Sequence, residues 1–401
     1  MVGFPFLAVA ANSLGLSSTL FSIIFRGLTA SIAMLIILRT SARRSWGITV
    51  FLFFWAVYFC RVSVESLLNP TDLYHPVSFY WIWGVGVCFL PALCALSYRH
   101  ADEVKNLQKH LGIIGVLACF LLLVNGSTSM MFANGDIVDI ERLNSTSLNP
   151  ISAGHLGVTT ALVGICSVLI GSKSRLSAAF WVLVIGIGVS LALMANSRGP
   201  IVAFMACMAF IFLAKAHRKR TYIISALFLI FAIYFSFSKS GVDTLNLSAV
   251  ANRFGASVSA EDASSTGRLL AYKGAVSQFL ESPIIGDALE EKSTGFYPHN
   301  IILEAFMATG LVGGIPFVVM LFAVARRAHW HIKVNSQYSW AAILVVQYIV
   351  GAMFSGAIYN VGTMWILIGI MLSPSLSRKK SKKNRVMHGY PHPSAPFDYC
   401  E

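Results

Sequence analysis

The sequence predicts an all-α polytopic membrane protein with about 12 transmembrane helices. Its composition is 56% hydrophobic and only 12% charged, whereas soluble globular proteins carry about 25% charged residues. This depletion matters because a charged side chain in hydrocarbon costs a few kcal/mol or more. In addition, apolar runs recur along the chain with the length of about 20 residues that a helix needs to cross about 30 Å of lipid.

Eleven spans are clear from these runs. They are expected at about 18–38, 49–67, 79–96, 111–125, 151–171, 177–196, 200–214, 221–238, 299–325, 337–355 and 358–373. Residues 2–17 are apolar, uncharged and short, and we favour a twelfth span there. The membrane domain then covers residues 1–373, and residues 374–401 form a basic tail.

The basic residues indicate the orientation of these spans. The formal net charge is +13, and 21 of the 30 Lys and Arg residues fall in loops on one side and in the tail. Cytoplasmic loops of membrane proteins carry such an excess. This side and the C-terminus are therefore expected in the cytoplasm, and the placement argues against nucleic-acid binding. The residues are Arg39, Arg43, Arg44, Arg99, Lys105, Lys109, Lys173, Arg175, Lys215, Arg218, Lys219, Arg220, Arg326, Arg327, Lys333, Arg378, Lys379, Lys380, Lys382, Lys383 and Arg385.

Two substantial loops remain for the outer face, at about 126–150 and 239–298. The second lies between the predicted ninth and tenth spans and is the longest polar stretch of the chain. Its apolar residues recur with a helical period, which predicts a folded loop with an amphipathic helix near 267–281 on the membrane surface. The segment Glu281-Ser282-Pro283 is expected to end that helix.

An arginine in a tight outer turn is the first candidate for a functional group. Arg198 lies in Asn196-Ser197-Arg198-Gly199-Pro200, directly before the span at 200–214. Backbone N–H groups at a helix start favour an anion, and a guanidinium binds phosphate oxygens in a bidentate manner. The segment indicates either a phosphate-binding group or an interfacial arginine bound to lipid headgroups.

Two further clusters stand on the same face. Arg268 opens the predicted surface helix, with Tyr272 four residues later on the same helix face. His299 lies where the long loop re-enters the membrane, and a histidine titrates near neutrality and can act as a base. Asn300 and Glu304 share a face of the next helix. The alternatives are a solvated arginine and a structural histidine.

Charges inside the predicted spans need partners as well. Arg61 and Glu65 are four residues apart, and we expect them to pair along one helix face. Arg26 has no local partner in the sequence and is a candidate for contact with an anionic lipid substrate.

Taken together, the clusters resemble the O-antigen ligase and Wzy polymerase superfamily. The resemblance covers most of the chain: many spans, short outer turns, one long outer loop late in the sequence and three further spans. A looser likeness is Arg142 followed by Asn149-Pro150 in the earlier loop. The short N-terminus departs from the pattern. The motifs are Ser197-Arg198-Gly199, Gly267-Arg268, Ser282-Pro283-Ile284-Ile285-Gly286 and Pro298-His299-Asn300 with Glu304 and Gly310.

The resemblance implies glycan transfer from undecaprenyl diphosphate on the periplasmic face of the bacterial inner membrane. It gives His299 the catalytic role of positioning or deprotonating the acceptor hydroxyl, with inversion at the anomeric carbon. Arg198 and Arg268 would bind the diphosphate, and Tyr272, Asn300, Glu304 and Arg142 would contact substrate. No metal and no cofactor are implied. The expected partners are the lipid-linked oligosaccharide, the bilayer and polysaccharide-assembly proteins.

Three activities remain open at this stage. We favour a repeat-unit polymerase, because the compact Tyr297-Pro298-His299-Asn300 and Leu303-Glu304 run is more similar to polymerases. The alternative is a ligase that joins the glycan to lipid A–core. A transporter or flippase of lipid-linked sugars is the third, although transporters often show an internal repeat and none is evident.

Overall fold

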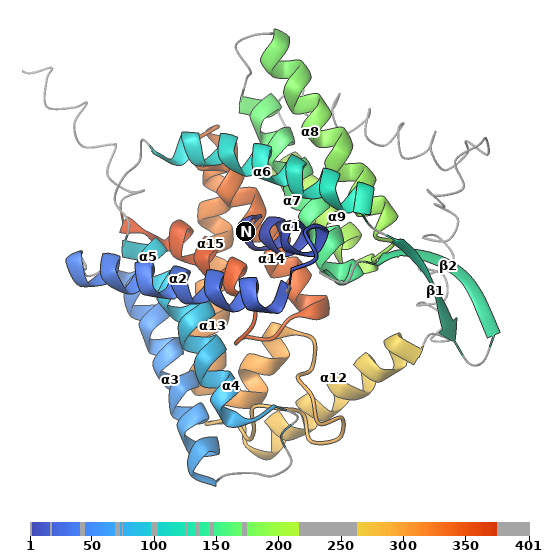
Figure 1. Cartoon of the computed structure of the whole chain (residues 1–401). Coiled ribbons are helices and arrows are strands. Elements are labelled where there is room, and N and C mark those ends of the chain that lie inside the picture. Colours follow the sequence, from blue (N-terminus) through green and yellow to red (C-terminus); the bar gives the residue numbers. More distant parts are fainter. Residues whose placement is uncertain are drawn as a thin grey trace, which may run out of the picture.

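The computed structural model describes residues 2–16, 18–40, 45–68, 73, 75–97, 103–125, 127–133, 136–144, 148–170, 175–215 and 263–374 (Figure 1). These residues form helices and one two-stranded hairpin. The elements are α1 (Gly3–Ser13), α2 (Ser18–Arg39), α3 (Trp46–Leu68), α4 (Val77–Trp81), the π-helix η1 (Ile82–Phe89), α5 (Leu90–Ser97), α6 (Glu103–Asn125), β1 (Ser127–Ala133), β2 (Asp136–Asn144), α7 (Pro150–Ile170), α8 (Arg175–Met194), α9 (Arg198–Ala214), α12 (Ala263–Glu281), α13 (Ile301–Lys333), α14 (Ser339–Ser355) and α15 (Gly362–Leu372).

Length and composition fit a polytopic membrane protein. Seven helical stretches of the described chain are long and apolar enough to cross a membrane, and α9, α14 and α15 are shorter apolar helices. The predicted span at 221–238 lies outside the described residues. Helix α1, within the span expected at 2–17, has 11 residues, or about 16 Å at 1.5 Å per residue, shorter than the length of about 20 residues that crosses a bilayer. The count of twelve therefore stays a prediction.

A β-hairpin between α6 and α7 departs from the all-α prediction. Strands β1 and β2 pair antiparallel, with Ala133 opposite Asp136 and Ser129 opposite Arg142. The sequence signal that we missed is Asn134-Gly135 between the two strands, because Asn-Gly is a strong signal for a two-residue hairpin turn. The first outer loop of the sequence analysis thus contains regular structure.

Aromatic rings fill the core between α3, α13 and α15. The ring centroids of Phe54 and Phe317 lie 4.9 Å apart, and those of Trp55 and Trp365 lie 4.7 Å apart. All four side chains are fully buried. Burying such large apolar groups among helices fixes how α13 stands against α3, and Figure 1 shows these two helices side by side.

Helix α13 is broken near its first third, and a loop fills the break. Gly310 has φ 58° and ψ −156°, which interrupts the helical hydrogen bonds. The N–H groups of Leu311 and Val312 bond instead to the carbonyls of Pro283 and Ile284, at 2.8 and 3.1 Å. In the other direction, the N–H of Asp287 bonds to the carbonyl of Met307 at 2.9 Å. The Ser282–Gly286 motif and Gly310 therefore form one backbone interlock.

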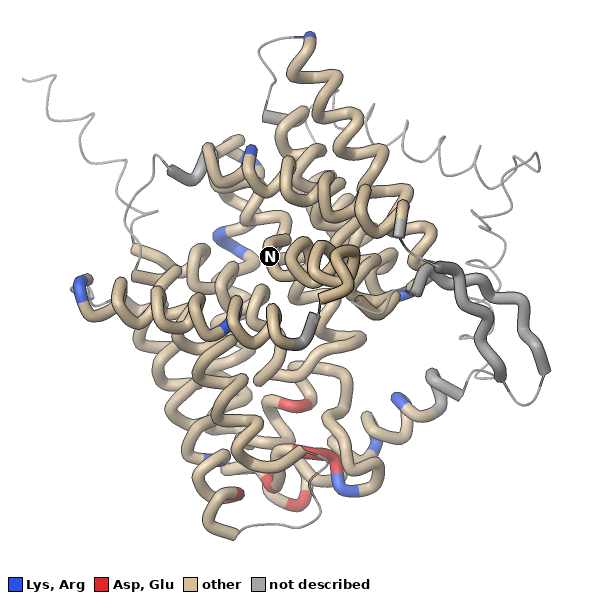
Figure 2. Tube along the Cα trace, viewed as in Figure 1, with Lys and Arg blue, Asp and Glu red and all other residues tan. Residues whose placement is uncertain are grey.

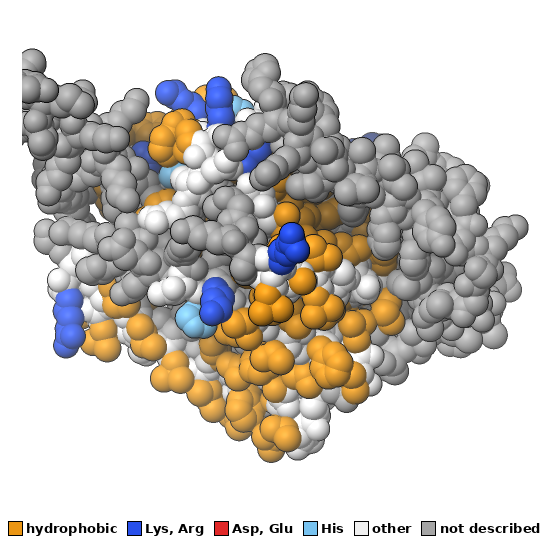
Figure 3. Space-filling view, turned by 90° about the horizontal axis from the view of Figure 1, so that it is seen from above, with side chains coloured by type: hydrophobic (Ala, Val, Ile, Leu, Met, Phe, Trp, Pro, Cys, Tyr) orange, Lys and Arg blue, Asp and Glu red, His pale blue; other side chains and the backbone are white. Residues whose placement is uncertain are grey.

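Described Asp and Glu residues lie mainly at one end of the structure, whereas Lys and Arg residues lie at both ends. Asp and Glu gather where α3, α4, α12 and the 282–300 loop meet, at the bottom of Figure 2, and we call this the acidic end. Figure 3 looks onto the opposite end, where Lys and Arg side chains stand among apolar ones and no described Asp or Glu is in view.

The interlock predicts that a side chain at Gly310 destabilises the protein. A Cβ at Gly310 would lie 2.3 Å from the carbonyl oxygen of Ile284, and its backbone conformation is one that non-glycine residues adopt at a cost of about 1–3 kcal/mol. We expect Gly310→Ala to lower the melting temperature of the purified protein sharply. Gly295→Ala is the matched control, because Gly295 also has positive φ but faces open space. Equal melting temperatures for the two variants would refute the interlock.

Candidate active site

The end of α14 and the turn that follows it, residues 356–361, connect the elements that carry the predicted site residues. The hydroxyl of Tyr272 on α12 lies 3.5 Å from the carbonyl oxygen of Met353. A Cβ at Gly199, at the start of α9, would lie 3.8 Å from the Cβ of Phe354. The N–H of Ile358 bonds to Glu304 on α13. Three helices that are remote in sequence, α9, α12 and α13, thus contact the end of α14 and the turn that follows it.

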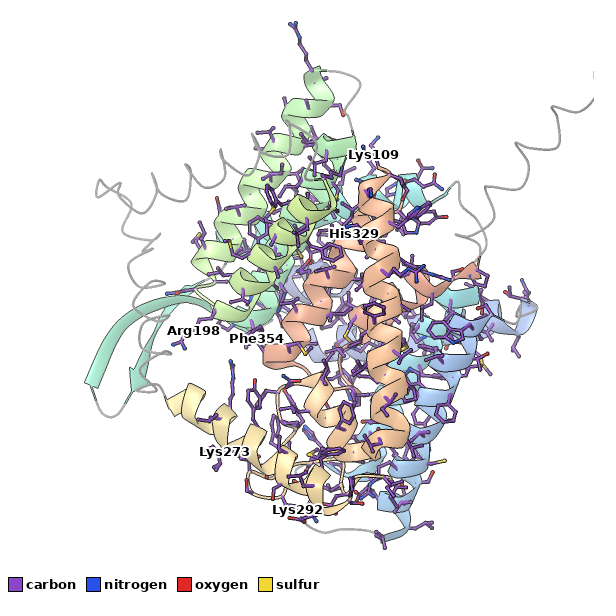
Figure 4. All side chains as sticks on the ribbon, turned by 180° about the vertical axis from the view of Figure 1, so that it is seen from behind. Lys109, Arg198, Lys273, Lys292, His329 and Phe354 are labelled. Carbon is purple, nitrogen blue, oxygen red and sulfur yellow. The ribbon has the colours of Figure 1, made fainter. Side chains whose placement is uncertain are left out.

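Arg198 is the first residue of α9. The backbone reaches it through Asn196, which has φ 42°, and an extended Ser197 at the N-cap. This geometry explains the short turn expected between α8 and α9. Figure 4 shows Arg198 next to Phe354, facing the helix α12 that carries Lys273. The arginine therefore lies at the start of a helix and on the side of the α14 end where Tyr272 docks.

Arg268 lies in the first half of α12, which begins and ends close to the predicted bounds of 267–281. Its guanidinium acts electrostatically on three neighbouring groups. Burial lowers the pKa of His299 to about 4, and the positive charge of Arg268 contributes to that shift. Burial raises the pKa of Tyr272 and of Tyr297, and Arg268 opposes both shifts. Arg268, Tyr272, Tyr297 and His299 therefore share one neighbourhood.

His299 stands directly before α13 in an unusual backbone conformation. Its φ is 53°, which a non-glycine residue adopts only at a cost. The imidazole packs against two rings, with centroids 4.5 Å from Tyr297 and 5.4 Å from Phe296. Its Nδ1 is buried and has no hydrogen-bond partner within the described part of the chain. A neutral imidazole with a free ring nitrogen beside a guanidinium can accept a proton from a bound hydroxyl.

The comparison with known families found one matching family model. Residues 182–318 match the O-antigen ligase family. This segment is about a third of the chain and contains Arg198, Arg268, Tyr272 and His299. The resemblance predicted from the motifs is thereby confirmed, and it indicates a membrane glycosyltransferase-like enzyme of the ligase or polymerase type. No curated protein sequence matches the chain.

Two other predicted residues of the O-antigen ligase segment make contacts within the protein. The side-chain oxygen of Asn300 accepts the N–H groups of Ile302 and Leu303, at 3.0 and 3.2 Å, and so caps α13. Glu304 is 1% exposed, and its carboxylate accepts the N–H of Ile358 at 2.9 and 3.1 Å. These contacts favour positioning roles over the direct substrate contact that we expected for both.

Of the predictions for the other charged groups, one is confirmed and one is not tested. The ion pair expected for Arg61 and Glu65 is confirmed, with 2.8 Å between Nη2 and Oε1. Arg142 lies on β2, outside the family match, and its side chain is not among those described. No group of three His, Cys, Asp or Glu side chains in the described ranges is placed to hold a metal ion.

Tyr297 is a site residue that the sequence analysis did not single out as a binding group. Its ring packs on His299, and its hydroxyl lies near the side chain of Asn360 in the 356–361 turn. The only available signal was its place in the Tyr297-Pro298-His299-Asn300 run. Nothing in the sequence indicates that it meets Asn360, some 60 residues later.

The charge of Arg268 sets a testable pH dependence. With its pKa lowered to about 4, His299 stays neutral from pH 5 to 8 and loses its basic form only below that window. Removing the nearby cation in Arg268→Gln should raise the His299 pKa, which an NMR titration of the imidazole measures.

The matched control for this titration is Lys273→Gln on the same helix, because Lys273 is exposed and is not among the causes of the His299 shift. An unchanged His299 pKa in Arg268→Gln, or an equal shift in both variants, would contradict the proximity of Arg268.

Proposed function

We propose that this protein transfers a glycan from undecaprenyl diphosphate to a sugar hydroxyl at the periplasmic face of the bacterial inner membrane. The observation that carries the proposal is the neutral, unpartnered Nδ1 of His299 beside Arg268, within the segment that matches O-antigen ligases. The acidic end is then periplasmic and the opposite, basic end is cytoplasmic, in line with the excess of Lys and Arg in cytoplasmic loops. The C-terminal tail is placed in the cytoplasm.

The reaction breaks the bond between the anomeric carbon and the diphosphate oxygen. The acceptor hydroxyl attacks the anomeric carbon from the opposite side, so the configuration inverts. Its proton goes to the imidazole of His299, and the electron pair of the broken bond stays on the departing diphosphate. Negative charge grows on that leaving group, and Arg198 and Arg268 stabilise it. Fixed cations are effective there because the site is partly withdrawn from water.

The other residues support this step. Tyr272 docks α12 against the end of α14 and so sets the distance between the two arginines. Asn300 and Glu304 hold the start of α13 and the 356–361 turn, which fixes the backbone on both sides of His299. Arg142 on the hairpin is proposed to contact the glycan. No step requires a metal ion or a cofactor.

Two acceptors fit this chemistry. We favour a second lipid-linked repeat unit, which makes the protein a polymerase. The alternative acceptor is lipid A–core, and the match to the O-antigen ligase family does not distinguish the two. The surface polysaccharide of a deletion strain separates the two. Loss of long chains with one repeat unit still on the core indicates a polymerase, and a bare core with polymer left on the lipid carrier indicates a ligase.

Replacing the proposed base tests the enzyme class. We expect His299→Gln to bind the lipid-diphosphate glycan with wild-type affinity and to lose turnover by about 10²–10⁴-fold, the usual value of general-base assistance. Binding and turnover are measured on purified protein in lipid nanodiscs. A flippase would still move its lipid without this base, so full transport by His299→Gln with no transfer product from the wild type would refute the proposal.

A further inference from the structure

A cavity lies next to the candidate active site and shares Tyr297 with it. It has a volume of about 410 Å³ and is lined by residues of α1, α2, η1, α5, α7, α14, α15 and the 356–361 turn. Ligand pockets have volumes of roughly 300–1,000 Å³. Arg198, Arg268 and His299 are not among its lining residues. Its polar lining includes Arg26, Thr29, Asn149, Ser152, His155 and Asn360.

Arg26 supplies a cation to this cavity. Its guanidinium lies over the rings of Phe4 and Trp83, 4.5 and 4.1 Å from their centroids. Rings hold a guanidinium by its faces and leave its in-plane N–H groups available for a planar acceptor. No described residue accepts a hydrogen bond from Arg26, and no Asp or Glu is among the lining residues. A cation in an apolar span needs an anionic partner, and here the ligand would supply it.

The walls of the cavity carry two further signs of a binding site. The Nδ1 of His155 is buried without a hydrogen-bond partner among the described residues. Its ring is packed so closely on α14 that a Cβ at Gly351 would lie 2.5 Å from it. The π-helix η1 contributes Trp83, Gly86 and Val87 to the opposite wall, and π-helical turns inside helices are frequent at functional sites.

Tyr297 joins the cavity to the active site. Its side chain lines the cavity together with Asn360, and its ring centroid lies 4.5 Å from that of His299. A ligand in the cavity is thus separated from the proposed base by one side chain. Between the cavity and His299, polar groups of α7 and the 356–361 turn can hydrogen-bond to sugar hydroxyls.

We propose that this cavity binds the diphosphate headgroup of the acceptor, a second polyprenyl-diphosphate-linked glycan, with Arg26 as the anion-binding group. The inference rests on the proposed function and favours the polymerase. Arg198 and Arg268 hold the donor diphosphate on one side of Tyr297, and Arg26 holds the acceptor diphosphate on the other. The acceptor keeps its diphosphate throughout, and only its sugar hydroxyl reacts at His299.

Binding stoichiometry of the full chain tests this assignment. Purified protein in nanodiscs of uncharged lipid is titrated with a radiolabelled polyprenyl-diphosphate oligosaccharide. The wild type should bind two molecules per chain. Arg26→Gln should weaken one of them by about 10–100-fold, the value of a charge-assisted hydrogen bond, and Arg198→Gln should weaken the other. The control is Arg39→Gln, which removes an exposed arginine from the same helix.

A second variant tests the cavity independently, so that the result does not depend on the folding of Arg26→Gln alone. Thr29→Trp fills the cavity one turn along α2 without a change in charge, and it should also abolish one of the two binding events. Two wild-type sites in both variants would overturn the cavity assignment while the proposed function stands. No binding of the probe to the wild type would instead overturn the proposed function.

A competition experiment distinguishes a site for the lipid-linked glycan from a site for ordinary phospholipid. Phosphatidylglycerol also carries a phosphate at headgroup depth, so it is titrated against the bound probe. The acceptor assignment expects both probe molecules to stay bound at equal lipid concentration. Displacement of one molecule by phosphatidylglycerol at similar affinity, abolished by Arg26→Gln, would make the cavity a general phospholipid site and overturn the assignment.

Discussion

Hydrogen bonding of the backbone inside the membrane is the constraint on which this structure depends. Lipid offers no partner to a free N–H or C=O, so a broken helix must find its partners in protein. At Gly310 the partners come from the Pro283–Ile284 backbone, which therefore lies at a fixed place against α13. The same loop leads to His299 and the start of α13. The break that interrupts the helix thus determines where the proposed base stands.

Buried carboxylates reinforce that loop. Glu304 accepts the N–H of Ile358, Glu65 accepts the N–H of Leu289 at 3.3 Å, and Glu290 accepts the hydroxyl of Tyr80. A carboxylate buried without such donors would be very costly, so each one ties two segments together. These three glutamates therefore serve to hold the scaffold together. Arg268 stands beside a neutral histidine and aromatic rings, an arrangement that suits an anionic substrate.

Local patterns predicted the elements well, and remote contacts account for what they missed. Apolar run length placed α3, α7 and α8 within a few residues, and the amphipathic period placed α12. The pair of Arg61 and Glu65 followed from helix geometry alone. The hairpin had a signal in Asn134-Gly135 that the composition of the loop obscured.

Other features had no local signal. The break in α13 requires carbonyls from 28 residues earlier in the chain, and the cavity around Arg26 combines helices from both ends of the sequence. For Glu304, sequence reasoning recognised the need for a partner, but only the fold reveals that the partner is a backbone N–H.

The electrostatics of the site also connect donor binding to catalysis under the proposed function. In the absence of substrate, Arg268 helps to hold the pKa of His299 near 4, and an imidazole of such low basicity is a poor proton acceptor. A bound diphosphate places negative charge against the same guanidinium and offsets its effect on the imidazole. The pKa of His299 then rises toward its ordinary value, because a nearby anion favours the protonated form. His299 therefore becomes an effective base when the donor is in place. In the empty site it is a weak base toward any water that enters.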